Sequence, residues 1–502
     1  MMIETISIDV SGETSFGFLQ DDKIIDNQII RSFFTDEVIC RMNGQTGLIE
    51  RTDLVVMEYP YYDREYLSCV YKHGMKYTNI DKRCLRVIFF SKQESKSIEE
   101  PSFPNDYKFL GFCTLFPVNS PYKLGRVSID PSALLNDNYS VISYPGKIHH
   151  LGYELTLDAF QCIKQLPYGL CCGHDSLWGI LNYFPKFHDY AATRFAEVMD
   201  DPENTLSVTD GISGKQMSLV LTRAGCLPVL RWTASDCYSY FDLIEELSAY
   251  VQSKIPVILL TNDGEFNHAI LCVGYQRMAF YGLTHDSAPL CVAYQDLQVS
   301  EEKPVRVAFT SALVNTLVVL DDSEFAYGQL PISDLSDADK NVSYGKICGF
   351  IAPLYSKIKL NYVSAKQFAL SYLCEQNADI GFFDLDCEMV EISIVIASSN
   401  TYKEFVRKNI NTYPYASCVL AMELPKLVWL IQISDKCLTS KERLTKEKRV
   451  SGVMLLDTTA FNMEQDVYCA LLGQKEAIFN DGNVPTCSNE GASGDVIYPK
   501  FQ

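Results

Sequence analysis

Residues 168–184, YGLCCGHDSLWGILNYF, hold the pattern most suited to chemistry, because two adjacent cysteines and a glycine precede apolar residues at helical spacing. A cysteine at the N-terminal end of a helix gains thiolate character, since the free N–H groups and the helix dipole favour a negative charge. Cys172 has this position if the helix opens around residues 175–176. It is therefore a candidate nucleophile, with Cys171 as the alternative, and Gly173 would let a substrate carbonyl approach the backbone closely.

A thiol nucleophile needs a base, and His268 is the best placed of the seven histidines in the chain. It opens an apolar strand, HAILCVGY, after a polar turn, so its ring can lie at the edge of a sheet that faces the start of a helix. Gln165, seven residues before Cys172, carries an amide that could join the Cys172 N–H in stabilising an oxyanion. These residue types suit acyl transfer through a thiol.

The order of these segments resembles papain-like cysteine peptidases. Gln165 comes first, CGHDSLWGILNYF and GKQMSLVLTRAG follow, and NHAILCVGY comes last. The pattern is most similar to the branch that cleaves double-glycine leader peptides, and it covers residues 165–322. The resemblance implies Cys172 as the nucleophile, His268 as the general base and then acid, and Gln165 as the oxyanion donor. It also implies hydrolysis of a peptide or isopeptide bond without a cofactor.

One spacing departs from the family pattern. Gln165 lies one residue farther from Cys172 than is usual, and this spacing would fit Cys171 instead. The Cys-Gly-x-x-Ser-Leu register aligns only with Cys172. Cys171 therefore stays the alternative nucleophile.

The residue that orients the imidazole is open among four aspartates. Asp286, in LTHDSAP, has the usual family separation from His268, and Asp296, in AYQDLQ, follows another strand. Asp321 and Asp322 end the strand LVNTLVVL, and this ending is similar to uncharacterised bacterial proteins that carry the same core. Those proteins would also contain counterparts of FLGFCTLFPVNSPYKLGRVSIDP and LPKLVWLIQIS. The similarity favours Asp321, with Asp286 and Asp322 as alternatives.

Cys171, Cys172 and His174 raise the question of a metal site. A structural zinc site needs four ligands and usually has separated Cys-x-x-Cys pairs, which this segment lacks. We therefore expect neither a metal nor another cofactor.

Two other classes of function compete with a peptidase. Residues 382–392, FFDLDCEMVEI, resemble the first motif of metal-dependent exonucleases, in which Asp386 and Glu388 would share two metal ions. That chemistry commonly needs a late histidine, and none follows position 285. The second class is a papain-like fold without activity, which would serve as a binding or scaffold protein.

The acidic composition limits the partners. A net charge of −20 over 502 residues repels phosphate backbones and anionic membrane surfaces, so we expect neither nucleic acid nor a membrane as a partner. The N-terminus has no basic segment followed by an apolar one, and apolar runs such as residues 313–320 are far shorter than the roughly 20 residues that span a bilayer. A cytoplasmic protein with a protein or peptide substrate is expected.

The length predicts about two to four domains, and the order of the elements predicts the α+β class. Residues 1–150 alternate β-rich runs with polar turns and predict a strand-rich N-terminal domain. Residues 151–335 place helical patterns before a succession of strands, as expected for a papain-like domain with a helix bundle and an antiparallel sheet. Residues 336–502 predict a mixed α/β domain that could complete the core. The flanking domains are expected to select the substrate or to bind a protein partner.

Overall fold

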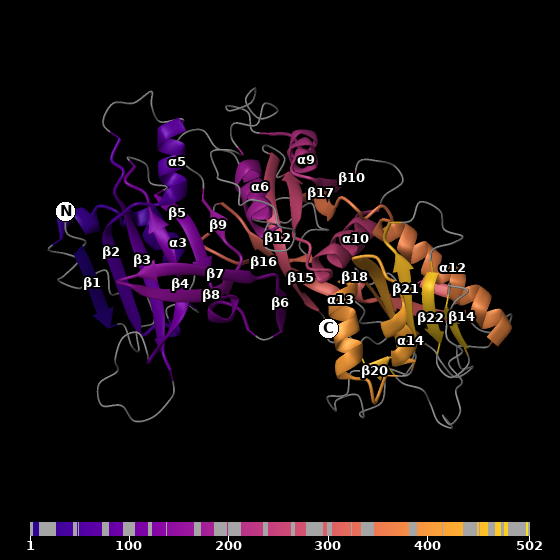
Figure 1. Cartoon of the computed structure of the whole chain (residues 1–502). Coiled ribbons are helices and arrows are strands. Elements are labelled where there is room, and N and C mark those ends of the chain that lie inside the picture. The colour runs from indigo at the N-terminus through magenta and orange to yellow at the C-terminus, as the bar shows by residue number, and fades with distance from the viewer. Residues whose placement is uncertain are drawn as a thin grey trace.

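Three main β-sheets follow one another across the molecule (Figure 1). The computed structural model describes residues 4–9, 27–43, 48, 50–72, 80–93, 106–118, 123–136, 138–164, 172–184, 198, 212–233, 239–262, 267–277, 295–298, 304–322, 324–332, 346–380, 389–413, 415–434, 449–450, 452–459, 467–472, 476–479 and 498–499. Within them, one apolar core cluster runs from the N-terminal sheet to the C-terminal one.

The N-terminal sheet has six strands in the order β1-β2-β3-β4-β5-β9, and each neighbouring pair is antiparallel. The strands are β1 (Glu4–Asp9), β2 (Leu54–Tyr61), β3 (Cys84–Lys92), β4 (Tyr107–Leu115), β5 (Leu124–Ile129) and β9 (Cys162–Ile163). The same part contains the helices α2 (Gln28–Arg31), α3 (Asp36–Asn43), α5 (Arg64–Lys72) and η3 (Pro131–Ala133), and the hairpin β7 (Tyr144–His150) and β8 (Tyr153–Ala159).

Both faces of this sheet are covered, which accounts for the continuous apolar run LRVIFF in β3. Val87 and Phe89 belong to the main core together with side chains of α3 and α5. Ile88 and Phe90 point to the other face and pack in a second cluster with side chains of β8. Successive residues of a strand point to opposite faces, so an apolar residue is needed at every position where both faces are buried.

The middle sheet carries the candidate site and has the strand order β10-β17-β11-β12-β15-β16, with β6 also pairing with β12. Its strands are β6 (Tyr139–Val141), β10 (Cys226–Trp232), β11 (Val257–Asn262), β12 (Asn267–Arg277), β15 (Val314–Leu320), β16 (Gly328–Pro331) and β17 (Lys346–Tyr355). All of these pairs are antiparallel. The helices of this part are α6 (Cys172–Tyr183), α9 (Gly214–Arg223), α10 (Tyr240–Gln252) and η4 (Thr310–Leu313).

Helix α6 is the central helix of this part and contacts both β12 and β9. Every residue from Gly173 to Leu181 is buried. A helix that is buried all round lies between layers, not at the surface. In α6 the layers are the N-terminal sheet, through β9, and the middle sheet, through β12. The start of α6 is therefore fixed by both sheets.

The C-terminal sheet has the order β13-β14-β18-β19-β21-β22-β23 and is antiparallel except for the parallel pair β14 and β18. Its strands are β13 (Gln295–Gln298), β14 (Pro304–Phe309), β18 (Met389–Ser398), β19 (Leu427–Ser434), β21 (Gly452–Asp457), β22 (Val467–Leu472) and β23 (Glu476–Phe479). The helices are α12 (Tyr362–Ile380), α13 (Ser399–Lys408) and α14 (Ala416–Ala421), and β20 (Arg449–Val450) pairs with β24 (Tyr498–Pro499). Trp429 of β19 joins this sheet to the main core and donates to the carbonyl of Leu360 at 2.9 Å.

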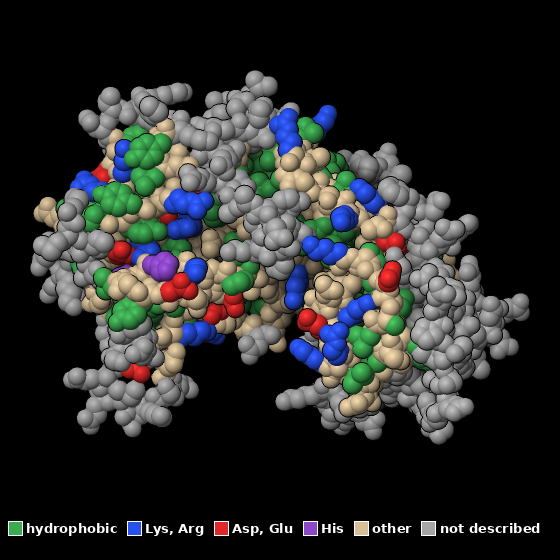
Figure 2. All heavy atoms as spheres, in the orientation of Figure 1, with side chains coloured by type: hydrophobic (Ala, Val, Ile, Leu, Met, Phe, Trp, Pro, Cys, Tyr) green, Lys and Arg blue, Asp and Glu red, His purple; other side chains and the backbone are tan. Residues whose placement is uncertain are grey.

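The structure confirms the α+β class: helices and predominantly antiparallel sheets coexist in one chain. The domain limits at residues 150 and 335 stay predictions, and strand pairing crosses both, because β9 belongs to the N-terminal sheet and β17 to the middle sheet. Among the described residues, no helix combines the length and the apolar character needed to cross a membrane. Basic and acidic side chains are interspersed over the described part of the face in Figure 2.

Candidate active site

Cys172 lies in the first turn of α6 and is partly exposed. The helix therefore begins at Cys172 itself, three residues earlier than the sequence pattern predicts. Gly173 explains how the first turn fits, because a Cβ atom there would lie 2.7 Å from Ile212 Cγ1 and 3.1 Å from Met217 Sδ. The early start places the thiol beside the free N–H groups of the helix, where a negative charge is stabilised.

His268 and Asp321 come from neighbouring strands of the middle sheet. His268 is the second residue of β12, and Asp321 directly follows β15, whose Leu320 pairs with Leu271. The His268 Nε2 atom lies 2.9 Å from Asp321 Oδ1. Asp322 is the more distant carboxylate, with Oδ1 at 3.6 Å from the same nitrogen. Because Nε2 forms the hydrogen bond with Asp321, Nδ1 is the ring nitrogen that can form the hydrogen bond with the Cys172 thiol.

The imidazole of His268 is held in its charged form by the two groups beside it. Burial alone lowers the pKa of His268, but hydrogen bonds to Asp321 and Cys172, together with the negative charges of both, raise that pKa to about 11. The ring is therefore an imidazolium at neutral pH. An imidazolium in contact with a cysteine favours the thiolate, which is the reactive form.

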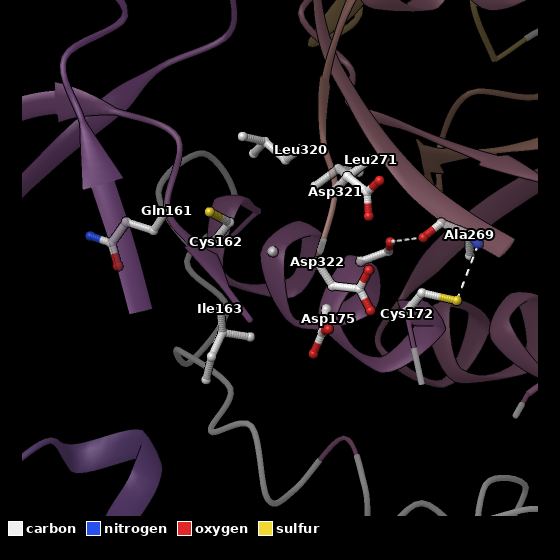
Figure 3. Close-up of a pocket in the computed structure, with 12 residues that line it drawn as sticks. Gln161, Cys162, Ile163, Cys172, Asp175, Ala269, Leu271, Leu320, Asp321 and Asp322 are labelled. Atoms are coloured by element: carbon white, nitrogen blue, oxygen red, sulfur yellow. Dashed lines mark hydrogen bonds between the residues drawn. The ribbon is translucent and has the colours of Figure 1, made fainter. Parts of the chain in front are cut away.

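Ala269, the residue after His268, joins β12 to α6 by two contacts that the sequence did not predict. Its N–H donates to Cys172 Sγ at 3.2 Å, and its carbonyl accepts from the Ser176 hydroxyl at 3.4 Å (Figure 3). The available sequence signal was the serine of Cys-Gly-x-x-Ser-Leu, which lies one helical turn after the nucleophile. An N–H aimed at sulfur stabilises the anion more than the neutral thiol.

Three carboxyl groups, those of Asp175, Asp321 and Asp322, line the same small cavity as Cys172 (Figure 3). With Cys162 and other residues of β9, α6, β12 and β15, they line a cavity of ≈ 10 Å³, about the size of one water molecule. Neither carboxyl oxygen of Asp175 has a hydrogen-bond partner in the part of the chain that the structure describes.

Burial changes the protonation of two of these acids. Burial first, and then the charges of Asp322 and Cys172, raise the pKa of Asp175 well above its usual range. Burial, followed by the hydrogen bond and the charge of Asp321, raises the pKa of Asp322 to about 7. The surroundings of Asp175 therefore favour its neutral form, and Asp322 titrates near neutral pH.

A larger pocket of ≈ 790 Å³ opens beside the thiol and the imidazole, and we call it the α9 pocket. It is lined by Cys172, Ile212, Ser213, Gly214, Lys215, Gln216, Met217, Leu230, Trp232, Leu260, Thr261, Asn267, His268, Ala269, Asp322 and Cys348. The sequence predicts core positions for Trp178, Trp232 and Trp429, with a place in a substrate groove as a second option for Trp178. The core position is confirmed for Trp178, which is 2% exposed, but it is wrong for Trp232, which lies at the sheet edge, is 42% exposed and lines the pocket.

Several predicted site residues lie outside the described residues: Gln165, Cys171, Asp286, Asp386 and Glu388. Their proposed roles stay predictions. The structure brings together the other predicted residues, Cys172, His268 and Asp321, with Asp322 at the margin of the group. Asp175 was missed, since a single acidic residue inside a helical pattern gives no signal of its own.

One group in the described part of the chain has ligand atoms close enough to hold a metal ion. The ligand atoms of His268, Asp321 and Asp322 lie within 4.8 Å of one another. A histidine must be unprotonated at the nitrogen that binds a metal. The raised pKa of His268 favours the imidazolium instead, so this geometry suits an ion pair with Cys172 and Asp321 better than a metal centre.

Comparison of the chain with protein-family models, with curated proteins and with solved structures gives no match. The function therefore has to be inferred from the geometry of the site.

Proposed function

We propose that the chain is a papain-like cysteine peptidase, which hydrolyses a peptide or isopeptide bond through Cys172, His268 and Asp321. The observation that carries the proposal is the meeting of these three residues at the start of α6. They come from three elements, and 97 residues separate Cys172 from the Ala269 amide that contacts its sulfur. A thiol, an imidazole and a carboxylate in this order form the arrangement that activates a thiol nucleophile.

The proposed fold of the middle part is a papain-like core. Helix α6 supplies the nucleophile, and the antiparallel sheet supplies the base from β12 and the orienting carboxylate from the end of β15. Helices α9 and α10 complete the helical part. In this proposal β17 belongs to the core, although it lies beyond residue 335.

The proposed reaction begins from the thiolate and imidazolium pair. The Cys172 sulfur attacks the substrate carbonyl carbon, and the new oxyanion is stabilised by the Cys172 N–H and, in the predicted role, by the amide of Gln165. Collapse of this intermediate breaks the C–N bond, and His268 gives its proton to the leaving amine. Water then attacks the thioester while His268 accepts a proton, which releases the acid and restores the thiolate. Asp321 holds the ring orientation in both steps.

The α9 pocket supports a peptide as the substrate. Its wall is apolar at Ile212, Met217 and Leu260, and it adjoins both Cys172 and His268. The Thr261 hydroxyl is buried without a hydrogen-bond partner among the described residues. An apolar substrate side chain next to the scissile bond would pack against this wall, and the substrate backbone could form a hydrogen bond with the Thr261 hydroxyl. We further propose a specific intracellular protein as the substrate.

Limited alkylation with iodoacetamide at neutral pH, mapped by mass spectrometry, tests the proposal. Cys40 is an exposed free thiol on α3 and serves as an internal reference. We expect Cys172 to react about tenfold faster than Cys40 or more, although it is less exposed, because Cys172, unlike Cys40, has an imidazolium beside it. The His268→Ala variant should lose this preference. Alkylation of Cys40 ahead of Cys172 would overturn the proposal and leave an inactive scaffold as the function.

A further inference from the structure

Two cations of the N-terminal part bind the turn that carries Asp321. The Lys164 Nζ atom donates to the backbone carbonyl of Asp321. The Arg41 Nη1 atom donates to the backbone carbonyl of Asp322 at 3.0 Å. The first contact joins residues that lie 157 positions apart in the sequence, and the second joins residues that lie 281 positions apart. The carbonyls of both aspartates are thus held by side chains from outside the middle sheet.

Lys164 reaches the site because the N-terminal sheet fixes its backbone. It directly follows β9, which pairs with β5, and its own N–H donates to the Gly125 carbonyl at 3.0 Å. Its residue is only 1% exposed. An ammonium group is almost never buried in this way without an acceptor and a compensating charge. Here the acceptor is the Asp321 carbonyl, and the compensating charge comes from the neighbouring aspartates.

Arg41 is the second cation that binds this turn, and it is less buried than Lys164. It lies on α3, its side chain is 13% exposed, and its Nε atom donates to Glu37 Oε1 at 2.7 Å. The ion pair with Glu37, four residues earlier on the same helix, keeps the guanidinium oriented towards the Asp322 carbonyl. Lys164 and Arg41 therefore approach consecutive carbonyls from two different elements of the N-terminal part.

We propose that Lys164 is a positioning residue of the active site, assisted by Arg41, so that the N-terminal sheet is a required part of the catalytic machinery. This inference rests on the proposed function. Lys164 acts through the turn: it holds Asp321 where its carboxylate reaches His268, and it supplies a positive charge to a group of buried acids. It also fixes the chain immediately before Gln165, the predicted oxyanion donor.

The charges around Lys164 define what its removal should change. The acidic groups that its charge affects are Asp175 on α6, Asp322 after β15 and the thiol of Cys162 on β9, and in each of them it opposes the effect of burial on the pKa. Without the ammonium, these acids lose a favourable partner. The pKa of Asp322, now about 7, should then rise.

The test compares Lys164→Met, which keeps the length of the side chain without its charge, with Lys164→Arg, which keeps the charge. Lys123→Met is the matched control, because Lys123 also donates to a backbone carbonyl in the N-terminal part, that of Ser32 at 2.6 Å, but outside the site. The readout is the rate of Cys172 alkylation by iodoacetamide in the full chain, measured from about pH 5 to about pH 10. Thermal unfolding of each variant is recorded in parallel.

For Lys164→Met we expect alkylation of Cys172 to slow by about tenfold or more, with its inflection near neutral pH moved to higher pH. Lys164→Arg should recover most of the rate, and Lys123→Met should behave as the wild type. A purely structural role would lower the unfolding temperature without moving the inflection. If Lys164→Met keeps both the rate and the profile of the wild type, the inference is wrong.

A second variant covers the case in which Lys164→Met does not fold. Arg41→Met removes the hydrogen bond to the Asp322 carbonyl and should slow alkylation of Cys172 by about threefold, with Lys123→Met again unchanged. An unchanged rate in Arg41→Met would overturn the inference in that case. Failure of the proposed function looks different, because then Cys172 of the wild type is no faster than Cys40.

Discussion

Ala269 donates its backbone N–H to the sulfur of Cys172 across 3.2 Å, so the residue next to His268 itself fixes the start of α6. The carbonyl of the same residue accepts from Ser176, one turn further along the helix. Strand β12 and helix α6 are therefore joined at both polar groups of one residue. The sulfur of Cys172 cannot move away from β12 without loss of the first of these bonds. Preorganisation of this kind is what a thiolate nucleophile requires.

The first prediction concerns this link. In Ser176→Ala, the loss of the hydroxyl should lower the free energy of unfolding by about 0.5–1.5 kcal/mol and slow the alkylation of Cys172 several-fold. Ser248→Ala is the matched control, because the Ser248 hydroxyl on α10 is also buried but has no hydrogen-bond partner among the described residues. Urea unfolding and alkylation rates measure both effects. Equal behaviour of the two variants would refute a special role for Ser176.

The second prediction separates the two consecutive aspartates. Asp321→Ala should lower the rate of peptide hydrolysis by about 100-fold, because the carboxylate 2.9 Å from His268 Nε2 is lost. Asp322→Ala should have a much smaller effect, since its carboxylate lies 3.6 Å from the same nitrogen. The measurement is kcat/KM on a peptide that the wild type cleaves. A larger loss in Asp322→Ala than in Asp321→Ala would reverse the assignment.

The parts of the site that the sequence predicted were those with local patterns. The apolar strand after His268 and the helical spacing after Cys172 were readable because each lies within one element. Asp321 was favoured by a resemblance, and the strand that it follows was visible as an apolar run. The class of the fold was predictable for the same reason, since it depends on the order of such runs.

The contacts between sheets could not be predicted in this way. Lys164 reaches Asp321 only because β9 joins the N-terminal sheet and α6 packs between two sheets. Trp232 was expected in the core, but it lies on β10, an edge strand of the middle sheet. Which strand lies at an edge depends on long-range pairing, and the pairing of β10 with β17 joins segments more than a hundred residues apart.

The third prediction concerns stability and pH. The pKa of His268 is about 11 in the folded chain against an ordinary value of 6.5, so between these values the His268 ring binds one proton more in the folded state than in the unfolded state. This contribution to stability is complete below about pH 6.5 and is lost as the pH rises towards 11. In His268→Gln the decline with pH should be shallower than in the wild type. Urea unfolding at several pH values from about 6 to 10 gives the comparison, and identical slopes would contradict it.

The fourth prediction uses Asp322. Its pKa of about 7 means that a negative charge appears near the His268 ring as the pH rises through neutrality. The alkylation rate of Cys172 should therefore show an inflection near pH 7, because the ion pair of thiolate and imidazolium senses this charge. Asp322→Asn should remove the inflection, while His149→Gln, at an exposed histidine of the N-terminal hairpin, should leave it in place. An inflection that persists in Asp322→Asn would assign it to another group.

The last prediction separates binding of the substrate from reactivity of the thiol. Trp232→Ala should raise the KM for a peptide substrate several-fold, because Trp232 lines the α9 pocket, but should leave alkylation of Cys172 by the small reagent iodoacetamide unchanged. Leu227→Ala is the matched control, since Leu227 is an exposed apolar residue of the same strand and does not line the pocket. If both variants raise the KM equally, the substrate contacts the whole edge of β10, and if neither does, it binds elsewhere. A loss of alkylation in Trp232→Ala would instead show that Trp232 supports the geometry of the thiol.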